Sequence, residues 1–300
     1  MKDATIIITV YNRTSFLAQA IDSVVSQNNV DRDDVEIIVV TNSWISKSDY
    51  PVDRIIFSED RSVGQKLHEG IRQATSDRIF FLEDDDLFLP AKLKSIIPLL
   101  DDMDVGYVHN LYVTGKEYRK QELEPQSFRI RKLTPQWLDN QSFYSFSKRF
   151  WDYSGNMSSI AIRKDAIDLN ELSKIKLLPD IFILPMALLR ERTCLQVDST
   201  LTFVRVNENS TTHRLFDPEL HRMAAEEIDS WVDYVSGKSV NLERQAHAIL
   251  AKRRIAGGLH NISFRDILLL FQYETATRML FGDIVSYIRN RSIFGDVQRI

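Results

Sequence analysis

Short apolar runs of strand length alternate with helical patterns along the first third of the chain. The runs lie at residues 5–10, 35–40, 54–57 and 79–82, and between the first two the apolar residues recur at the spacing of one helix face. Runs without polar alternation are typical of strands buried on both faces of a parallel sheet. Strands that alternate with helices imply right-handed crossovers. The pattern predicts an α/β fold with a Rossmann-like, mostly parallel sheet flanked by helices.

The pattern changes twice after these strands. A further strand is predicted at 104–113, and the stretch 116–153 then mixes cations with aromatic residues that either pack on the sheet or bind sugar faces. From residue 217 the spacing is helical, over 220–235, 242–256 and 263–291. We therefore expect a catalytic domain at 1–215, with halves at 1–113 and 114–215, and a helical C-terminal extension at 216–300.

Four consecutive acids, Glu83, Asp84, Asp85 and Asp86, follow the apolar run 79–82. Ligands of open α/β sheets bind at the carboxyl ends of the strands. Acids crowded at such an edge repel one another, and a divalent cation such as Mg²⁺ or Mn²⁺ would neutralise them. The alternative is an acidic surface turn, but an apolar pattern resumes at once at Leu87, and Pro90 then fits the first turn of a helix.

Two other strand ends carry polar or aromatic residues: Tyr11 and Arg13 follow the first strand, and Thr41 and Asn42 follow the second. An aromatic ring can stack on a base, and an arginine can bind a diphosphate. Because no glycine-rich phosphate loop is present, a cation would have to carry much of the phosphate charge. The residues thus indicate a nucleotide site, with a packed aromatic and a surface cation as the alternative.

Composition sets limits on the class of protein. The chain has 300 residues, a formal net charge of −4 and a single cysteine, Cys194. The charge argues against nucleic acid as the partner, and one cysteine excludes an intrachain disulfide framework. Neither a signal peptide nor an apolar segment of membrane-spanning length is found. We expect a cytoplasmic protein. The apolar stripe at 267–288 is expected to pack on the body of the protein or on a second copy in a homodimer, with peripheral attachment at the inner face of the membrane as the alternative.

Two stretches carry a family resemblance. Residues 5–27, with Thr-Val-Tyr-Asn-Arg after the first strand, and residues 70–90, which lead into the acids, resemble family 2 glycosyltransferases of the GT-A fold. The resemblance is strong over residues 5–113. It implies that the donor nucleotide lies at Thr9, Tyr11 and Arg13. It also implies that Asp84 contacts the ribose and phosphates, and that Asp85, with Glu83 at the first acid of the DXD motif, holds Mn²⁺ or Mg²⁺.

The same resemblance shows two departures. After the second strand the family commonly has an aspartate that reads uracil, where this chain has Thr41 and Asn42. Asparagine offers both a donor and an acceptor to a base edge. Asp180 stands where the family places the aspartate of its Glu-Asp pair, so it is the expected catalytic base, while Pro179 replaces the glutamate. The alternative for Asp180 is an N-terminal helix cap.

The sequence therefore predicts a metal-dependent glycosyltransferase. By the resemblance, it transfers a sugar with inversion from a nucleoside-diphosphate donor, a UDP-sugar being the first expectation. The acceptor would be a hydroxyl of a glycan, a polysaccharide or a lipid-linked molecule. A nucleotidyltransferase on the same type of sheet stays open, although it would normally bring a glycine- and lysine-rich loop after its first strand. An inactive carbohydrate-binding or scaffold protein also stays open because of Thr41 and Pro179.

Overall fold

The computed structural model describes residues 2–118, 128–206, 217–258 and 263–277. The chain divides into two compact units, one made of Met1–Trp137 and Tyr153–Leu215 and the other of Leu138–Asp152 and Phe216–Ile300. The second unit thus includes a segment that lies within the sequence range 1–215. The division into a catalytic domain and a C-terminal extension stays a prediction.

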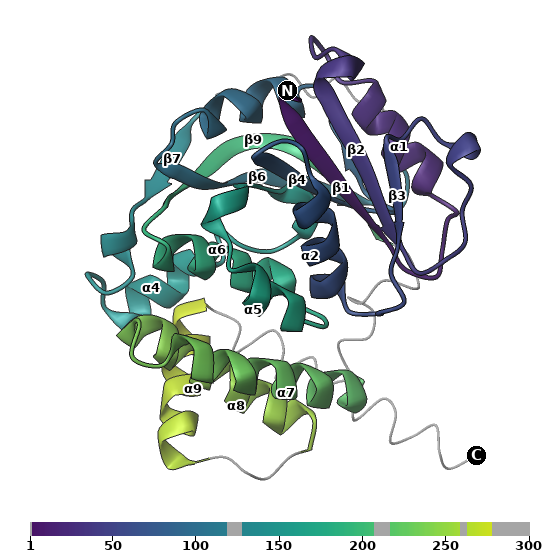
Figure 1. Ribbon diagram of the computed structural model, residues 1–300. Coiled ribbons are helices and arrows are strands. Elements are labelled where there is room, and N and C mark those ends of the chain that lie inside the picture. Colours follow the sequence, from purple (N-terminus) through teal and green to yellow (C-terminus); the bar gives the residue numbers. More distant parts are fainter. Residues whose placement is uncertain (1, 119–127, 207–216, 259–262, 278–300) are drawn as a thin grey trace, which may run out of the picture. The chain divides into compact units, whose positions relative to one another are not determined.

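A single sheet forms the centre of the first unit (Figure 1). Among the described residues its strand order is β3-β2-β1-β4-β8-β6-β9-β5, and β7 pairs with β9. The strands are β1 (Ala4–Val10), β2 (Val35–Thr41), β3 (Arg54–Phe57), β4 (Arg78–Glu83), β5 (Leu87–Phe88), β6 (Val105–Gly115), β7 (Ile130–Leu133), β8 (Ile160–Arg163) and β9 (Thr193–Arg205). The helices of this unit are α1 (Leu17–Val25), α2 (Val63–Gln73), α3 (Lys92–Ile96), α5 (Leu169–Lys174) and α6 (Pro179–Leu189).

The first four of these strands are parallel, with β1 between β2 and β4. Both faces of β1 are covered: Ile6 and Ile8 belong to the same core as the buried residues of α1, and Ile7 lies under α2. Gly70 of α2 sits so close to the sheet that a Cβ there would lie 2.7 Å from Ile7 Cγ2. The prediction of buried strands in a parallel, Rossmann-like sheet is confirmed for β1, β2 and β4, whereas β3 is an edge strand whose Phe57 is 58% exposed.

The second half of the sheet is mixed. β8 is antiparallel to both β4 and β6, β6 is parallel to β9, and β5 and β7 are antiparallel to β9. The prediction that Pro90 lies in the first turn of a helix is wrong. Leu87 and Phe88 instead pair with Phe203 and Thr202 as the short strand β5, so α3 begins only at Lys92. The predicted strand at 104–113 is confirmed as β6.

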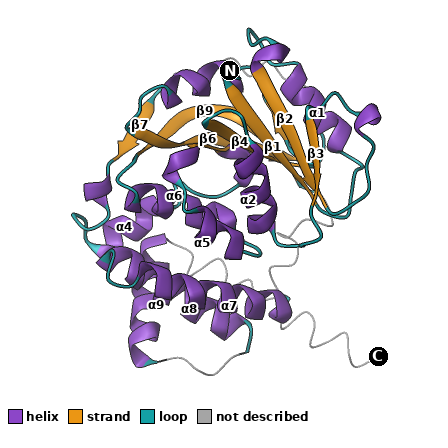
Figure 2. Cartoon of the chain, viewed as in Figure 1, coloured by secondary structure: helices purple, strands orange, loops and turns teal. Residues whose placement is uncertain are grey.

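The second unit contains the helices α4 (Phe143–Phe150), α7 (Pro218–Val235), α8 (Val240–Ala256) and α9 (Phe264–Thr277), shown as helices in Figure 2. The amide of Asn241, at the start of α8, donates to the carbonyls of Leu138 and Gln141 and so ties α8 to the segment before α4. In the described part of the chain, no helix is long and apolar enough to cross a membrane. Residues 278–288, half of the apolar stripe predicted at 267–288, lie outside the described residues.

Candidate active site

The carboxyl ends of β1, β2 and β4 meet at one edge of the sheet, as the sequence predicted. Thr9 pairs with Glu83 across β1 and β4, and Val10 pairs with Thr41 across β1 and β2. This is also a switch point of the sheet, because the chain leaves β1 toward β2 and β3 on one side and later returns to β4 on the other. Ligands of open α/β sheets bind in the crevice at such a point.

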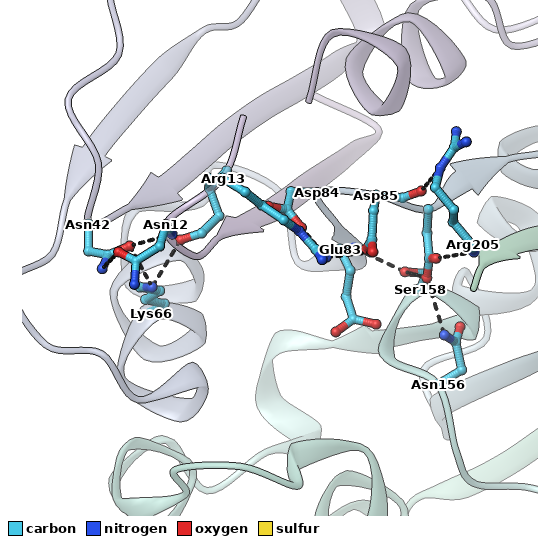
Figure 3. Close-up of polar contacts among 12 residues, drawn as sticks. Asn12, Arg13, Asn42, Lys66, Glu83, Asp84, Asp85, Asn156, Ser158 and Arg205 are labelled. Atoms are coloured by element: carbon cyan, nitrogen blue, oxygen red, sulfur yellow. Dashed lines mark hydrogen bonds and ion pairs between the residues drawn. The ribbon is translucent and has the colours of Figure 1, made fainter. Parts of the chain in front are cut away.

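Arg13 joins the end of β1 to the acids that follow β4 (Figure 3). Its Nη2 atom lies 2.9 Å from Asp84 Oδ1 and 2.5 Å from Asp85 Oδ2, and its Nε also donates to Asp84 at 3.1 Å. Burial raises the pKa of Asp84, and the hydrogen bond and charge of Arg13 oppose that shift. The structure thus brings three of the predicted site residues together, with a guanidinium beside two nearly buried carboxylates.

The carboxylate of Asp86 accepts hydrogen bonds from three different residues. Its Oδ2 accepts from Ser158 Oγ at 2.6 Å and from Asn156 Nδ2 at 3.2 Å, and its Oδ1 accepts from the backbone N–H of Arg205 at 2.9 Å. Burial raises the pKa of Asp86 to about 6, and the hydrogen bond from Ser158 opposes the shift. Its carboxylate therefore ties the turn after β4 to the segment before β8 and to the end of β9.

Glu83 differs from its neighbours because no donor among the described residues contacts its carboxylate. Its backbone N–H donates to Ser158 Oγ at 3.0 Å, and its side chain turns away from Arg13 (Figure 3). Burial raises the pKa of Glu83 well above its usual range, and the charges of Asp86, Asp85, Asp180 and Asp84 raise it further. A carboxylate in this position needs either a proton or a cation.

Asp180 lies in the first turn of α6, behind Pro179. Its Oδ2 accepts from the backbone N–H of Asn156 at 3.1 Å. The residue that caps α6 is Leu178, which makes no side-chain capping bond. Because the Asn156 amide group also reaches Asp86, a single residue joins Asp180 to the acid group.

The segment that carries Asn156 is held from below by β6. Tyr107 donates from its hydroxyl to the carbonyl of Tyr153 at 2.5 Å, and His109 Nε2 lies 2.8 Å from the carbonyl of Gly155. Burial lowers the pKa of His109 to about 4, so the ring is neutral at pH 7. Gly155 and Asn156 both have positive φ, 95° and 56°. These buried bonds hold the turn in a conformation that L side chains seldom adopt.

This turn gives a stability prediction for Asn156. We expect Asn156→Ala to lower the free energy of unfolding by about 1 kcal/mol more than Asn156→Gly. Both variants lose the hydrogen bond to Asp86, but only alanine also strains the positive φ. Urea denaturation of both variants measures the difference. Equal stabilities would show that the backbone at this position is not strained.

At the other end of the site, Asn12 and Asn42 form an amide pair above Lys66 (Figure 3). Asn42 Nδ2 donates to Asn12 Oδ1 at 2.9 Å, and the backbone N–H of Asn12 donates to Asn42 Oδ1 at 3.3 Å. Lys66 Nζ donates to the carbonyl of Val10 at 2.9 Å and to Asn42 Oδ1 at 3.4 Å, and it lies 4.8 Å from the centroid of the Tyr11 ring. Burial lowers the pKa of Lys66 to about 8.

The remaining predicted residues are placed as follows. Thr9 is half-buried beside Glu83, and the Thr41 hydroxyl is engaged in its own turn, where it donates to the carbonyl of Ser43 and accepts from its N–H. The sequence analysis missed Lys66, although a lysine on the buried face of an amphipathic helix is a detectable signal. It also missed the residues that orient the acids, which come from distant segments: Asn156, Ser158 and Arg205.

The family model for "Glycosyl transferase family 2" matches residues 5–168, which is more than half of the chain. The chain belongs to glycosyl transferase family 2. The resemblance noted in the sequence is thereby confirmed, and the α/β fold is of the GT-A type.

Related proteins agree with this assignment. An uncharacterised glycosyltransferase of Nostoc sp. is 30% identical over 118 residues, which cover 36% of this chain and 36% of the relative. One of Rickettsia typhi is 30% identical over 145 residues, which cover 41% of this chain and 45% of the relative. The chain thus matches less than half the length of these curated relatives.

Solved structures share the fold of this chain. S. aureus TarS 1-349 in complex with UDP-GlcNAc has a TM-score of 0.57 and 14% identity, and the match covers 92% of this chain and 82% of the 1-349 chain. The mannosyltransferase PcManGT from Pyrobaculum calidifontis, in complex with GDP-Man and Mn²⁺, has a TM-score of 0.54 and 14% identity, with coverage of 96% and 86%. At these identities the likeness supports the GT-A fold and nothing finer.

Proposed function

We propose that this glycosyltransferase moves a sugar from a nucleoside-diphosphate donor to an acceptor hydroxyl, with inversion and with the help of a divalent cation. The observation that carries the proposal is the row of side chains at the switch point of the sheet. An exposed Tyr11 ring comes first, Arg13 lies next against Asp84 and Asp85, and Asp180 lies beyond them, joined to the acid group by Asn156. The order suits a base, a diphosphate and a sugar laid along one edge.

The acids fit a divalent cation that is shared with phosphate. Among the described residues, no three acidic, histidine or cysteine side chains are grouped closely enough to hold a metal ion by themselves. Mg²⁺ and Mn²⁺ commonly use one or two carboxylates and complete their shell with water and substrate phosphates. Glu83, whose carboxylate has no donor in the described structure, and Asp85 would supply those oxygens. PcManGT, which has the same fold, binds GDP-Man together with Mn²⁺.

The reaction would use three parts of the site. Arg13 would hold the diphosphate, and Asp84 would keep Arg13 and the ribose in place. Asp180 would accept the proton of the acceptor hydroxyl, with its carboxylate oriented by the Asn156 N–H. A cation at Asp85 would stabilise the negative charge that develops on the departing diphosphate. Attack from the face opposite to that diphosphate inverts the anomeric carbon.

The acceptor is proposed to be a hydroxyl of a glycan or a lipid-linked sugar. Tyr112 of β6 is 43% exposed, and the charges of Asp180 and Asp86 contribute, after burial, to raising its pKa. An exposed aromatic ring near the proposed base suits the apolar face of a sugar. For the donor, the resemblance suggests uridine, and the two structural neighbours bind UDP-GlcNAc and GDP-Man.

The test is ligand-dependent stability followed by donor hydrolysis. We expect UDP, GDP, dTDP or CDP to raise the melting temperature by several degrees in the presence of Mn²⁺, and EDTA to remove most of that shift. Release of nucleoside diphosphate and free sugar from a panel of nucleotide sugars would support transfer. Release of pyrophosphate would instead indicate a nucleotidyltransferase. If no donor is bound and none is hydrolysed, the proposal is contradicted.

A further inference from the structure

The amide pair at the end of β1 and β2 has a fixed orientation. Asn42 Oδ1 accepts from the backbone N–H of Asn12 and from the Lys66 ammonium group, which are both donors only. The oxygen of Asn42 must therefore face them, and its NH₂ group faces Asn12 Oδ1. Both amide oxygens are thereby occupied. A flipped amide at either residue would set donor against donor.

The hydrogen-bonding capacity that remains here consists of donors. The NH₂ group of Asn12 and the second N–H of Asn42 have no partner among the described residues. The neighbouring acceptors are used: the Thr41 hydroxyl accepts from Ser43, and the Val10 carbonyl accepts from Lys66. Asn12 is also held at a φ of 53°, which asparagine tolerates better than most residues. The pair is thus a built feature that presents N–H groups.

If the proposed function holds, the base of the donor lies at this pair. Arg13 sets the place of the diphosphate, one residue after Asn12, and the Tyr11 ring is 48% exposed beside the pair. Asn12 and Asn42 are both open to solvent at least in part, whereas Lys66 is almost fully buried beneath them. A base stacked on Tyr11 would therefore present its hydrogen-bonding edge to the two amides. Lys66 would not contact the base but would hold the oxygen of Asn42.

We propose that this site reads cytosine, and that the donor is a cytidine-diphosphate sugar. Cytosine presents two adjacent acceptors, O2 and N3, which match the free N–H groups of Asn12 and Asn42. Uracil carries an N–H at position 3, which would face the amide N–H groups donor against donor and would lose the hydrogen bond that cytosine N3 accepts. Lys66 is a positioning residue in this proposal, because it keeps the Asn42 oxygen turned away from the base. The proposal replaces the UDP-sugar expected from the family resemblance with a CDP-sugar.

The test compares CDP with UDP by isothermal titration calorimetry in the presence of Mn²⁺. The two ligands share the ribose and the diphosphate, so their affinity ratio isolates the base. We expect CDP to bind about tenfold more tightly than UDP. Equal binding, or tighter binding of UDP or GDP, would overturn the cytosine proposal while leaving the glycosyltransferase proposal intact. If no nucleotide binds at all, the proposed function fails together with this inference.

Two variants test the roles of the amide pair. Asn42→Asp replaces a donor of the wild type by an acceptor, and it also gives Lys66 an anionic partner. The ratio of UDP affinity to CDP affinity should therefore rise by at least tenfold. Lys66→Met removes one of the two donors that hold the Asn42 oxygen, the other being the Asn12 N–H, so the ratio of CDP affinity to UDP affinity should fall. If Lys66 is purely structural, the variant should bind CDP and UDP more weakly by the same factor, and the ratio of the two affinities should stay unchanged. That result would contradict the assignment of Lys66 as a positioning residue.

Discussion

Asp85→Asn should lower sugar transfer by about 10²- to 10³-fold, the usual cost of losing a group that stabilises transition-state charge. Asparagine keeps the size of the side chain and removes the charge that a cation would need. Arg13 would lose one of its two carboxylate partners at the same time. The measurement is the rate of nucleoside-diphosphate release with donor, acceptor and Mn²⁺, alongside the Mn²⁺-dependent rise in melting temperature with a nucleotide.

Asp84→Asn is the matched control for this variant. It removes the same charge from the same turn and also takes a carboxylate from Arg13. In our proposal Asp84 holds Arg13 and the donor, while Asp85 holds the cation. Asp84→Asn should therefore weaken nucleotide binding and still respond to Mn²⁺, whereas Asp85→Asn should lose that response. An Asp85→Asn protein that keeps both its turnover and its Mn²⁺ response would refute the assignment of Asp85.

The strands and their polar ends could be predicted because the information is local. An unbroken apolar run such as residues 79–82 is most stable in an α/β protein as a strand that helices cover on both faces. Once the run is a parallel strand, its carboxyl end is fixed, and with it the edge at which Glu83 to Asp86 emerge. A helix follows Pro90 as predicted, although Pro90 lies just before the N-cap Ala91. The short strand β5 could not be predicted because pairing of Leu87 and Phe88 with β9 is a tertiary interaction.

The supporting residues could not be predicted because their partners are distant in sequence. Arg205 reaches the acid turn across more than one hundred residues, with its N–H on Asp86 and its Nε on the carbonyl of Asp85. Lys92 is fully buried and donates to Asn110 and Thr202, and no local pattern indicates such a partner set. The position of Asp180 was available only through the family resemblance, since its contact with Asn156 depends on the packing of α6.

Such buried cations have a shared effect on the site. Arg205 and Lys92 lie on the protein side of the acids, and the charge of Asp86 opposes the lowering of the Lys92 pKa that burial causes. They are compensated by carbonyl and hydroxyl groups, as buried charges must be. Asp86 accepts hydrogen bonds from Ser158, Asn156 and the Arg205 N–H, whereas the Glu83 carboxylate has no donor among the described residues. This asymmetry is what suits the outer side of the group to a cation.

Asp180→Asn is expected to lower the turnover number by about 10²- to 10⁴-fold, the range for loss of a general base. Donor affinity should change less than about twofold, because Asp180 is assigned to the acceptor hydroxyl and its carboxylate accepts from the Asn156 N–H. Stability should change by at most about 1 kcal/mol, since the lost charge lies in the first turn of α6.

The pH profile separates a base from a helix-stabilising charge. A base must be deprotonated to act, so wild-type turnover should fall as the pH drops through its pKa, and Asp180→Asn should lose that limb. Asp168→Asn is the control, because Asp168 caps the nearby helix α5 through the N–H groups of Asn170 and Glu171, and asparagine caps equally well. That variant should keep both its rate and its pH profile. Full turnover in Asp180→Asn would show that the carboxylate only stabilises the start of α6 and is not the base.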